Sequence, residues 1–191
     1  MSEPKSNRSP SAAVHIMDAE AIRRALRRIA HEIIERNPAL EKIVLAGIPS
    51  RGVEIARRIA DFIGTIEKTR IDTGVIDVAM HRDDVGKRAQ LPVVQTSQLP
   101  LPLDDRIVII VDDVLFTGRT VRAAMDAISS FGRPACIQLA ALIDRGHREL
   151  PIRADYVGKN LPSALEEKVL VRLKDVDGEA DAVRLLKAEE A

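Results

Sequence analysis

Short apolar runs alternate with amphipathic stretches along most of this chain of 191 residues. Two stretches between the runs, 53–63 and 121–131, have helical spacing and end at Gly64 and Gly132. Strands that alternate with helices in this way predict an α/β fold with a doubly wound, mostly parallel sheet flanked by helices. The runs that read as strands are 42–48 (KIVLAGI), 75–80 (VIDVAM), 106–111 (RIVIIV) and 136–144 (CIQLAALID).

A longer helix is predicted to begin after Asp18, a residue type suited to the N-cap, and to end near Asn37. Its apolar residues recur at the spacing of one helical face. The opposite face is basic, because Arg23, Arg27 and His31 are four residues apart and form one stripe.

We interpret residues 14–180 as a single domain. Residues 1–13 mix Ser, Pro and charges without periodicity and predict a disordered tail, and residues 181–191 are expected to form a charged C-terminal tail. Residues 81–105 carry charges and prolines with little periodicity, which predicts a long mobile loop of the kind that often serves as a lid.

The composition narrows the class of protein. The 29 basic and 29 acidic side chains cancel, so nucleic acid binding would require a local basic face. Four aromatic residues are too few for the base-stacking sheets of RNA-binding folds. Cys136 is the only cysteine and no signal peptide or apolar membrane span is evident, so we expect a cytoplasmic protein without a membrane partner.

The stretch DDVLFTGRT, residues 112–120, directly follows the apolar run at 106–111. Ligands of open α/β sheets bind at the carboxyl ends of strands, where Asp112 and Asp113 are expected. The following turn leads into a helix whose backbone N–H groups and dipole suit a phosphate. Paired carboxylates next to a phosphate site fit a ribose 5-phosphate, because the carboxylates can accept from its hydroxyl groups.

Other motifs are absent or weaker. The chain has neither a Walker A loop nor a Rossmann glycine pattern, and its four histidines lack the spacing of a structural zinc site. Residues 49–52, PSRG, also follow a predicted strand, and their amides and guanidinium suit a pyrophosphate.

The sequence VIIVDDVLFTGRT resembles the signature of type I phosphoribosyltransferases, which bind phosphoribosyl pyrophosphate (PRPP). The resemblance implies their fold with a small hood, and Mg²⁺ that is carried by PRPP near Asp112 and Asp113 without direct protein ligation. It implies catalytic roles for Arg51, Arg82, Asp112 and Asp113, with the two arginines neutralising the departing pyrophosphate. The implied PRPP- and UMP-binding residues are Ser50, Arg51, Gly52, Arg82, Asp112, Asp113, Val114, Thr117, Gly118, Arg119, Thr120, Arg145 and Val157.

Residues 144–162 and the basic helix resemble the pyrimidine operon attenuation regulators, which are bifunctional uracil phosphoribosyltransferases. The resemblance covers about residues 14–175. It implies a base-binding and hood segment at 144–162, uracil and UMP as ligands, a pyrimidine-operon mRNA stem-loop as partner, and a dimer or higher homo-oligomer. The RNA contacts that it suggests, which we expect to form one basic patch distinct from the PRPP cleft, are Arg27, His31, Arg148, Arg153 and Lys159.

Three other functions fit the sequence less fully. One is a uracil phosphoribosyltransferase whose basic helix is inert, and another is a UMP-sensing regulator with negligible turnover. A purine or orotate transferase is disfavoured by the sequence of residues 144–160.

Overall fold

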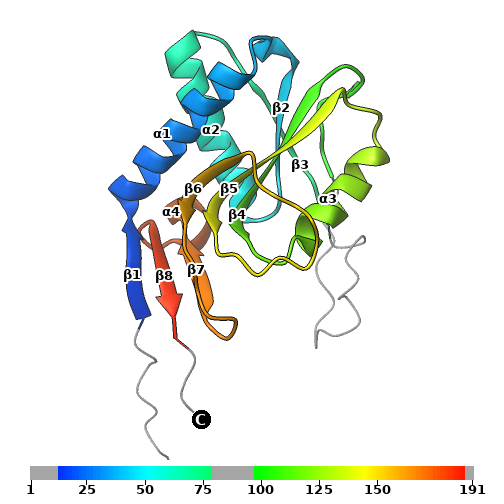
Figure 1. The fold of residues 1–191 in the computed structure, drawn as a ribbon. Helices are drawn as coiled ribbons and strands as arrows, with labels where there is room; N and C mark the ends of the chain where they lie inside the picture. Colours follow the sequence, from blue (N-terminus) through cyan, green and yellow to red (C-terminus); the bar gives the residue numbers. More distant parts are fainter. Residues whose placement is uncertain (1–12, 79–96, 188–191) are drawn as a thin grey trace, which may run out of the picture.

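A computed structural model describes residues 13–78 and 97–187, and its centre is a five-stranded parallel sheet (Figure 1). The strands lie in the order β3-β2-β4-β5-β6, and three long helices connect or flank them. The doubly wound α/β prediction is therefore confirmed. The strands are β2 (Ile43–Gly47), β3 (Asp72–Val75), β4 (Ile107–Leu115), β5 (Cys136–Asp144) and β6 (Tyr156–Asn160), and the helices are α1 (Ala19–Arg36), α2 (Arg51–Glu67) and α3 (Arg119–Ser129).

Alternate side chains of the central strands enter two different cores. Leu45 and Ile109 pack with residues of α1 and α2, whereas Val44 and Val108 pack with residues of α3. Because successive side chains of a strand point to opposite faces, a continuous apolar run is needed to cover both faces of the sheet.

A second sheet of three antiparallel strands forms the hood, in the order β1-β8-β7. Its strands are β1 (Ala13–Asp18), β7 (Lys168–Arg172) and β8 (Ala182–Leu186), and the short helix α4 (Lys174–Asp177) connects the last two. Figure 1 shows this sheet below the main sheet, beside the end of β4 that leads toward α3.

The two predicted tails were wrong at their inner ends. Residues 182–186 form β8, the central strand of the hood, because Val183 is fully buried and Leu185 nearly so. Ala13 already belongs to β1, and residues 1–12 and 188–191 lie outside the described residues.

The segment predicted as a mobile loop is packed over its last part. Residues 81–96 lie outside the described residues, but Gln98 exchanges two backbone hydrogen bonds with Val75. Leu103 is fully buried against the α3 side of the sheet. The described end of this segment is therefore attached to the sheet at Gln98 and Leu103, and the mobility of the loop stays a prediction.

Several element boundaries also differ from the predictions. Helix α2 begins at Arg51 and continues through Gly64 to Glu67, while the strand expected at 75–80 is β3, which ends at Val75. Within the expected base-binding and hood segment at 144–162, residues 156–160 form β6 at the edge of the main sheet. Within residues 13–78 and 97–187, none of the helices has the length and apolarity needed to cross a bilayer.

A buried polar network joins the end of α1 to the sheet. The Tyr156 hydroxyl donates to Gln138 Oε1 at 2.7 Å, and Gln138 Nε2 donates to Asn37 Oδ1 at 2.9 Å. Asn37 Nδ2 also donates to the Ile33 carbonyl at 2.9 Å, which caps the helix. Because buried polar groups need partners, this network specifies how α1 meets β5 and β6.

Tyr156→Phe removes the hydroxyl from this network while keeping the ring. We expect the free energy of unfolding to fall by about 1–3 kcal/mol, because buried polar groups lose a partner. Urea denaturation followed by circular dichroism measures the change. Thr65→Ala removes an exposed hydroxyl that bonds its own helix, and should change stability by less than about 0.5 kcal/mol; equal effects would contradict the role of the network.

Candidate functional site

Two adjacent carboxylates lie near the carboxyl end of β4. Asp112 and Asp113 fall inside the strand, which continues to Leu115 and is therefore longer than the run predicted at 106–111. Asp112 is 8% exposed and Asp113 is partly buried. The Asp113 N–H donates to Asp112 Oδ1 at 2.9 Å, and the Val114 N–H donates to Asp113 Oδ1 at 3.0 Å. Both carboxylates are thus fixed against the local backbone.

The turn after β4 leads directly into α3. Gly118 is the N-cap of α3 with φ +91°, a left-handed conformation that glycine adopts without steric strain. The Thr117 carbonyl accepts from the Glu149 and Leu150 N–H groups at 3.0 and 3.2 Å. These bonds hold the turn, and Arg119 and Thr120 then form the first turn of the helix, where N–H groups and the dipole attract anions.

Residues 49–52 come close to the carboxylates through a glycine contact. The Pro49–Ser50 peptide bond is cis, and α2 begins at Arg51. A Cβ on Gly52 would lie 2.3 Å from the Val111 carbonyl oxygen, so only glycine allows α2 to start this close to β4. The structure therefore brings the Ser50–Gly52 loop beside Asp112, as the sequence predicted for a shared ligand.

Arg51 is paired with a hood residue that the sequence analysis did not identify. Its Nε and Nη2 donate to Asp177 Oδ2 and Oδ1 at 3.0 and 2.6 Å. This hydrogen-bonded pair raises the pKa of Arg51, and the negative charge of Asp113 contributes in the same direction. The Arg51 hydrogen bonds are also the main cause that lowers the pKa of Asp177 to about 2.

A cavity of about 360 Å³ lies beside the end of β5. Arg145 is 6% exposed there, and its guanidinium lies 4.2 Å from the ring centroid of Phe116. Arg145 donates to Ser163 Oγ at 3.0 Å and to the Ala164 carbonyl at 2.7 Å, and burial lowers its pKa. The lining residues are Asp144, Arg145, Gly146, His147, Asn160, Pro162 and Ser163.

Val157 lies on the edge strand β6 next to α1. Arg28 Nη2 donates to the Val157 and Gly158 carbonyls at 3.1 and 2.5 Å. Arg28 lies beside the stripe of Arg23, Arg27 and His31 on the polar face of α1, but its hydrogen bonds to β6 were not predicted. The polar face of a helix gave no signal that one of its arginines would bind the sheet edge.

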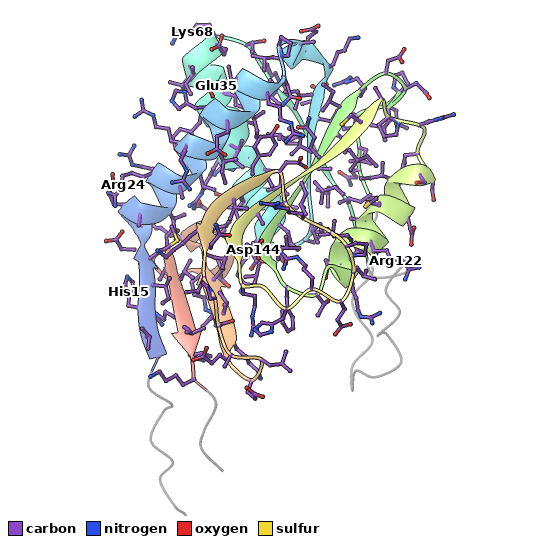
Figure 2. The ribbon with its side chains drawn as sticks, in the orientation of Figure 1. His15, Arg24, Glu35, Lys68, Arg122 and Asp144 are labelled. Carbon is purple, nitrogen blue, oxygen red and sulfur yellow. The ribbon has the colours of Figure 1, made fainter. Side chains whose placement is uncertain are left out.

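The five candidate RNA contacts differ in their exposure and in the elements that carry them. Arg27 and His31 are exposed on α1, and Lys159 is exposed on β6, the strand that α1 contacts through Arg28. Arg153 is exposed in the loop between β5 and β6. Figure 2 shows Asp144, where that loop begins, between Arg24 of α1 and Arg122 of α3.

Arg148 belongs to the loop between β5 and β6, which packs against the turn at residues 117–120. It donates to the Phe116 carbonyl at 2.7 Å and to the Ile152 carbonyl at 2.9 Å, and it forms an ion pair with Asp144 at 2.5 Å. The Arg148 guanidinium is therefore half-buried against backbone carbonyls, whereas Arg27 and His31 are exposed, and its role as an RNA contact stays a prediction. Arg82 lies outside the described residues.

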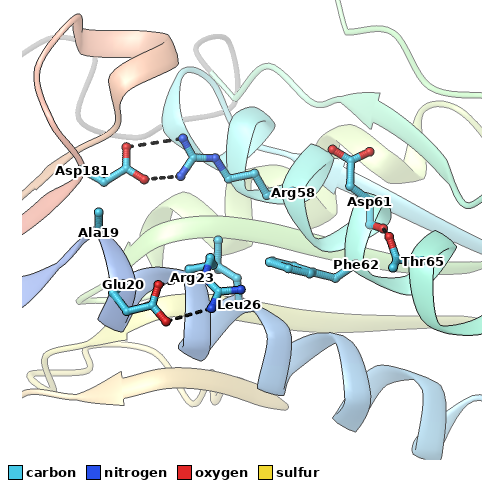
Figure 3. A pocket seen from close by; sticks show the side chains of 9 residues that line it. All are labelled: Ala19, Glu20, Arg23, Leu26, Arg58, Asp61, Phe62, Thr65 and Asp181. Atoms are coloured by element: carbon cyan, nitrogen blue, oxygen red, sulfur yellow. Dashed lines mark hydrogen bonds and ion pairs between the residues drawn. The ribbon is translucent and has the colours of Figure 1, made fainter.

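A larger cavity, about 530 Å³, lies between α1 and α2 and contains none of the predicted ligand residues (Figure 3). Its apolar part includes Leu26 and Phe62. Its cations are paired with carboxylates, Arg23 with Glu20 and Arg58 with Asp181. This cavity offers no group that resembles the predicted chemistry.

The fold and this site define a phosphoribosyltransferase, and the chain matches the model of the phosphoribosyl transferase domain over residues 14–172. It is 54% identical to the bifunctional protein PyrR of Roseiflexus sp. over 172 residues, which cover 90% of this chain and 94% of the relative. It is 58% identical to the bifunctional protein PyrR of Chloroflexus aurantiacus over 170 residues, which cover 89% and 93%. The chain belongs to the PyrR family.

Solved structures agree with this fold at much lower sequence identity. A hypoxanthine phosphoribosyltransferase of Trypanosoma cruzi in complex with IMP has a TM-score of 0.72 and 20% identity, covering 96% of this chain and 98% of that chain. A hypoxanthine-guanine phosphoribosyltransferase of Bacillus anthracis has a TM-score of 0.67 and 16% identity, covering 91% and 98%. These similarities concern the fold.

Gly52→Ala should disturb both the start of α2 and ligand binding. The added methyl would meet the Val111 carbonyl at 2.3 Å, and overpacking of this kind costs about 1–3 kcal/mol. Gly64→Ala is the matched control on the same helix, because its Cβ would lie 3.1 Å from the Thr69 carbonyl. Denaturation and PRPP calorimetry should show large losses for Gly52→Ala alone; similar losses at both positions would contradict the contact.

Proposed function

We propose that this protein converts uracil and PRPP to UMP and pyrophosphate, and that it binds the mRNA stem-loop of pyrimidine genes when UMP is bound. One observation carries the catalytic part. The Gly52 contact with Val111 brings a second polar loop to the pair Asp112 and Asp113. Ribose hydroxyls, a 5-phosphate and a pyrophosphate on one ligand then find three different sets of partners at one sheet edge.

The proposed roles follow from the chemistry of each group. Asp112 and Asp113 accept from the ribose hydroxyls, and the N-terminal turn of α3 with Thr117 and Thr120 holds the 5-phosphate. The Ser50–Gly52 loop holds the pyrophosphate, and Arg82 remains a sequence-based candidate for the same group. Charge neutralisation of the leaving pyrophosphate and exclusion of water then favour transfer at the ribose C1.

The donor set fits Mg²⁺ that arrives with PRPP. Among the described residues, no group of three His, Cys, Asp or Glu side chains could hold a metal. Two carboxylates on neighbouring residues are hard oxygen donors, and Mg²⁺ usually combines one or two of these with phosphate oxygens and water. The bound ion would supply positive charge to the pyrophosphate.

The cavity at Arg145 is the proposed uracil site. It lies next to Phe116, which precedes the phosphate turn, so a base held there would be attached to a ribose whose phosphate lies at α3. The resemblance to the attenuation regulators implies that backbone groups near Val157 also contribute to the base site. Arg145 is held by Ser163 and Ala164, which fixes the wall of this cavity.

The proposed RNA surface consists of α1 and the adjacent β6. Arg27, His31 and Lys159 are exposed there, and Arg153 extends the positive charge into the loop before β6. Exposed cations suit RNA phosphates because binding releases counterions. The names of the PyrR relatives, which call them bifunctional, support a second activity beside transfer.

Asp112→Asn combined with Asp113→Asn should abolish UMP synthesis while the fold survives, because the acceptors for the ribose hydroxyls and the negative charge beside the PRPP-borne Mg²⁺ are lost. Steady-state assays with uracil and PRPP measure the effect, and circular dichroism checks the fold. Asp126→Asn, an exposed carboxylate on α3 paired with Arg122, is the control. Turnover of the double variant within a few-fold of wild type would refute the assignment.

Arg27→Glu combined with Lys159→Glu should weaken stem-loop binding while uracil turnover stays near wild type. Each lost phosphate contact should lower the slope of log affinity against log salt by roughly 0.7–0.9. The control pair, Arg122→Glu with Arg133→Glu, makes the same change of charge on α3 and in the segment after it, away from α1 and β6. Mobility shifts with leader RNA, with and without UMP, measure both pairs, and UMP should tighten RNA binding as much as RNA tightens UMP binding. Normal RNA binding by the first pair at every salt concentration would refute the proposed RNA surface.

A further inference from the structure

Asp177 is the most heavily hydrogen-bonded carboxylate that the described residues place near the proposed pyrophosphate loop. Besides the two bonds from Arg51, it accepts from Arg172 Nη1 at 3.1 Å and from the Leu173 N–H at 2.8 Å. Its side chain is 10% exposed. These contacts fix the carboxylate at the end of α4, so it forms a rigid partner for whatever it binds.

The pairing also fixes the orientation of Arg51. Asp177 takes the Nε–Nη2 edge of the guanidinium, and the Nη1 group lies outside this pair. Arg51 is the first residue of α2, directly after the cis peptide and next to Gly52. Gly52, the next residue, packs against Val111 and Asp112, so Arg51 lies at the end of α2 that is close to the carboxylates of β4. The guanidinium is therefore held between the hood and the proposed pyrophosphate site.

The same two elements are joined by another ion-pair cluster that does not include Arg51. Arg58 of α2 forms ion pairs with Asp181, with Asp175 at 2.9 Å, and with Glu54 at 2.6 Å. The Lys174 N–H donates to Asp181 at 2.8 Å. This cluster already attaches the hood to α2. The Arg51–Asp177 pair is therefore not needed for that attachment alone.

We propose that Asp177 is a positioning residue that aims the Arg51 guanidinium at the pyrophosphate group of PRPP. The inference rests on the proposed function, because it assigns the Ser50–Gly52 loop to pyrophosphate. An unpaired arginine loses considerable side-chain entropy when a ligand orders it. A guanidinium that is already ordered by a buried carboxylate loses less, and it meets the charge of the leaving group without reorganisation.

Calorimetry with Mg²⁺-pyrophosphate and, separately, with UMP tests this role on the full chain. UMP lacks the pyrophosphate, so positioning and general support of the fold give different results. For Asp177→Asn we expect pyrophosphate affinity to fall about tenfold, KM for PRPP to rise and UMP affinity to stay within about twofold, in line with one lost charge-assisted contact. Asp181→Asn, which weakens the other cluster, should leave pyrophosphate affinity unchanged.

Two further variants separate orientation from charge. Asp177→Glu keeps the charge but moves the carboxylate by one methylene, so its pyrophosphate affinity should be intermediate. In an Arg51→Ala background, Asp177→Asn should have no additional effect on pyrophosphate affinity, since the positioned group is gone. Wild-type affinity in the Glu variant, or an additive effect in the double variant, would overturn the role.

The remaining outcomes also decide the question. Equal losses of pyrophosphate and UMP affinity in Asp177→Asn would make Asp177 a support of the fold, and tighter pyrophosphate binding would make it a competitor of the ligand. Either result overturns the proposal. Uracil turnover by the wild type tests the proposed function separately, because pyrophosphate calorimetry does not depend on catalysis.

Discussion

The approach of α2 to β4 at Gly52 is the constraint on which the rest of the site depends. The absence of a side chain lets the helix begin against the Val111 carbonyl, one residue before Asp112. Because β2 and β4 are neighbouring parallel strands, that contact brings the loops that follow them close together at one edge of the sheet. In open α/β sheets ligands bind outside the carboxyl ends of the strands, which is the edge where these loops lie. A bulkier residue at position 52 would separate the loop that holds Arg51 from the carboxylates.

The hood contributes to the site through ion pairs that reach α2. Strand β8 lies between β1 and β7, so the last described strand joins the first strand of the chain to the segment that carries α4. Asp177 and Asp181 then bind Arg51 and Arg58, one helical face of α2. Because these partners are partly or largely buried, their charges interact more strongly than surface pairs do. Packing of the hood and orientation of Arg51 are therefore coupled.

Local sequence predicted much of the main sheet and the start of α1. The run at 136–144 coincides with β5, and Asp18 caps α1 as expected, since its side chain accepts from the Ala21 N–H at 2.7 Å. Helix α2 extended beyond Gly64, because interior packing of Ile63 and its neighbours outweighs the weak helix propensity of one glycine. Strand β8 was not predicted, because the segment after residue 180 is charged and the strand is buried only by its two neighbouring strands.

The sequence by itself determined the alternation of strands and helices. It also determined that two carboxylates precede a Thr-Gly-Arg-Thr turn within residues 112–120, because both features are local patterns of periodicity and spacing. Only the tertiary structure decided the partners of the arginines. Arg28 binds a carbonyl 129 residues away, and Arg51 binds Asp177 across 126 residues. Arg148 binds the Phe116 carbonyl and does not extend into solvent. A guanidinium has the same local signal whether it meets solvent, a sheet edge or a hood carboxylate. The choice depends on which distant backbone and acid groups folding brings within hydrogen-bond distance.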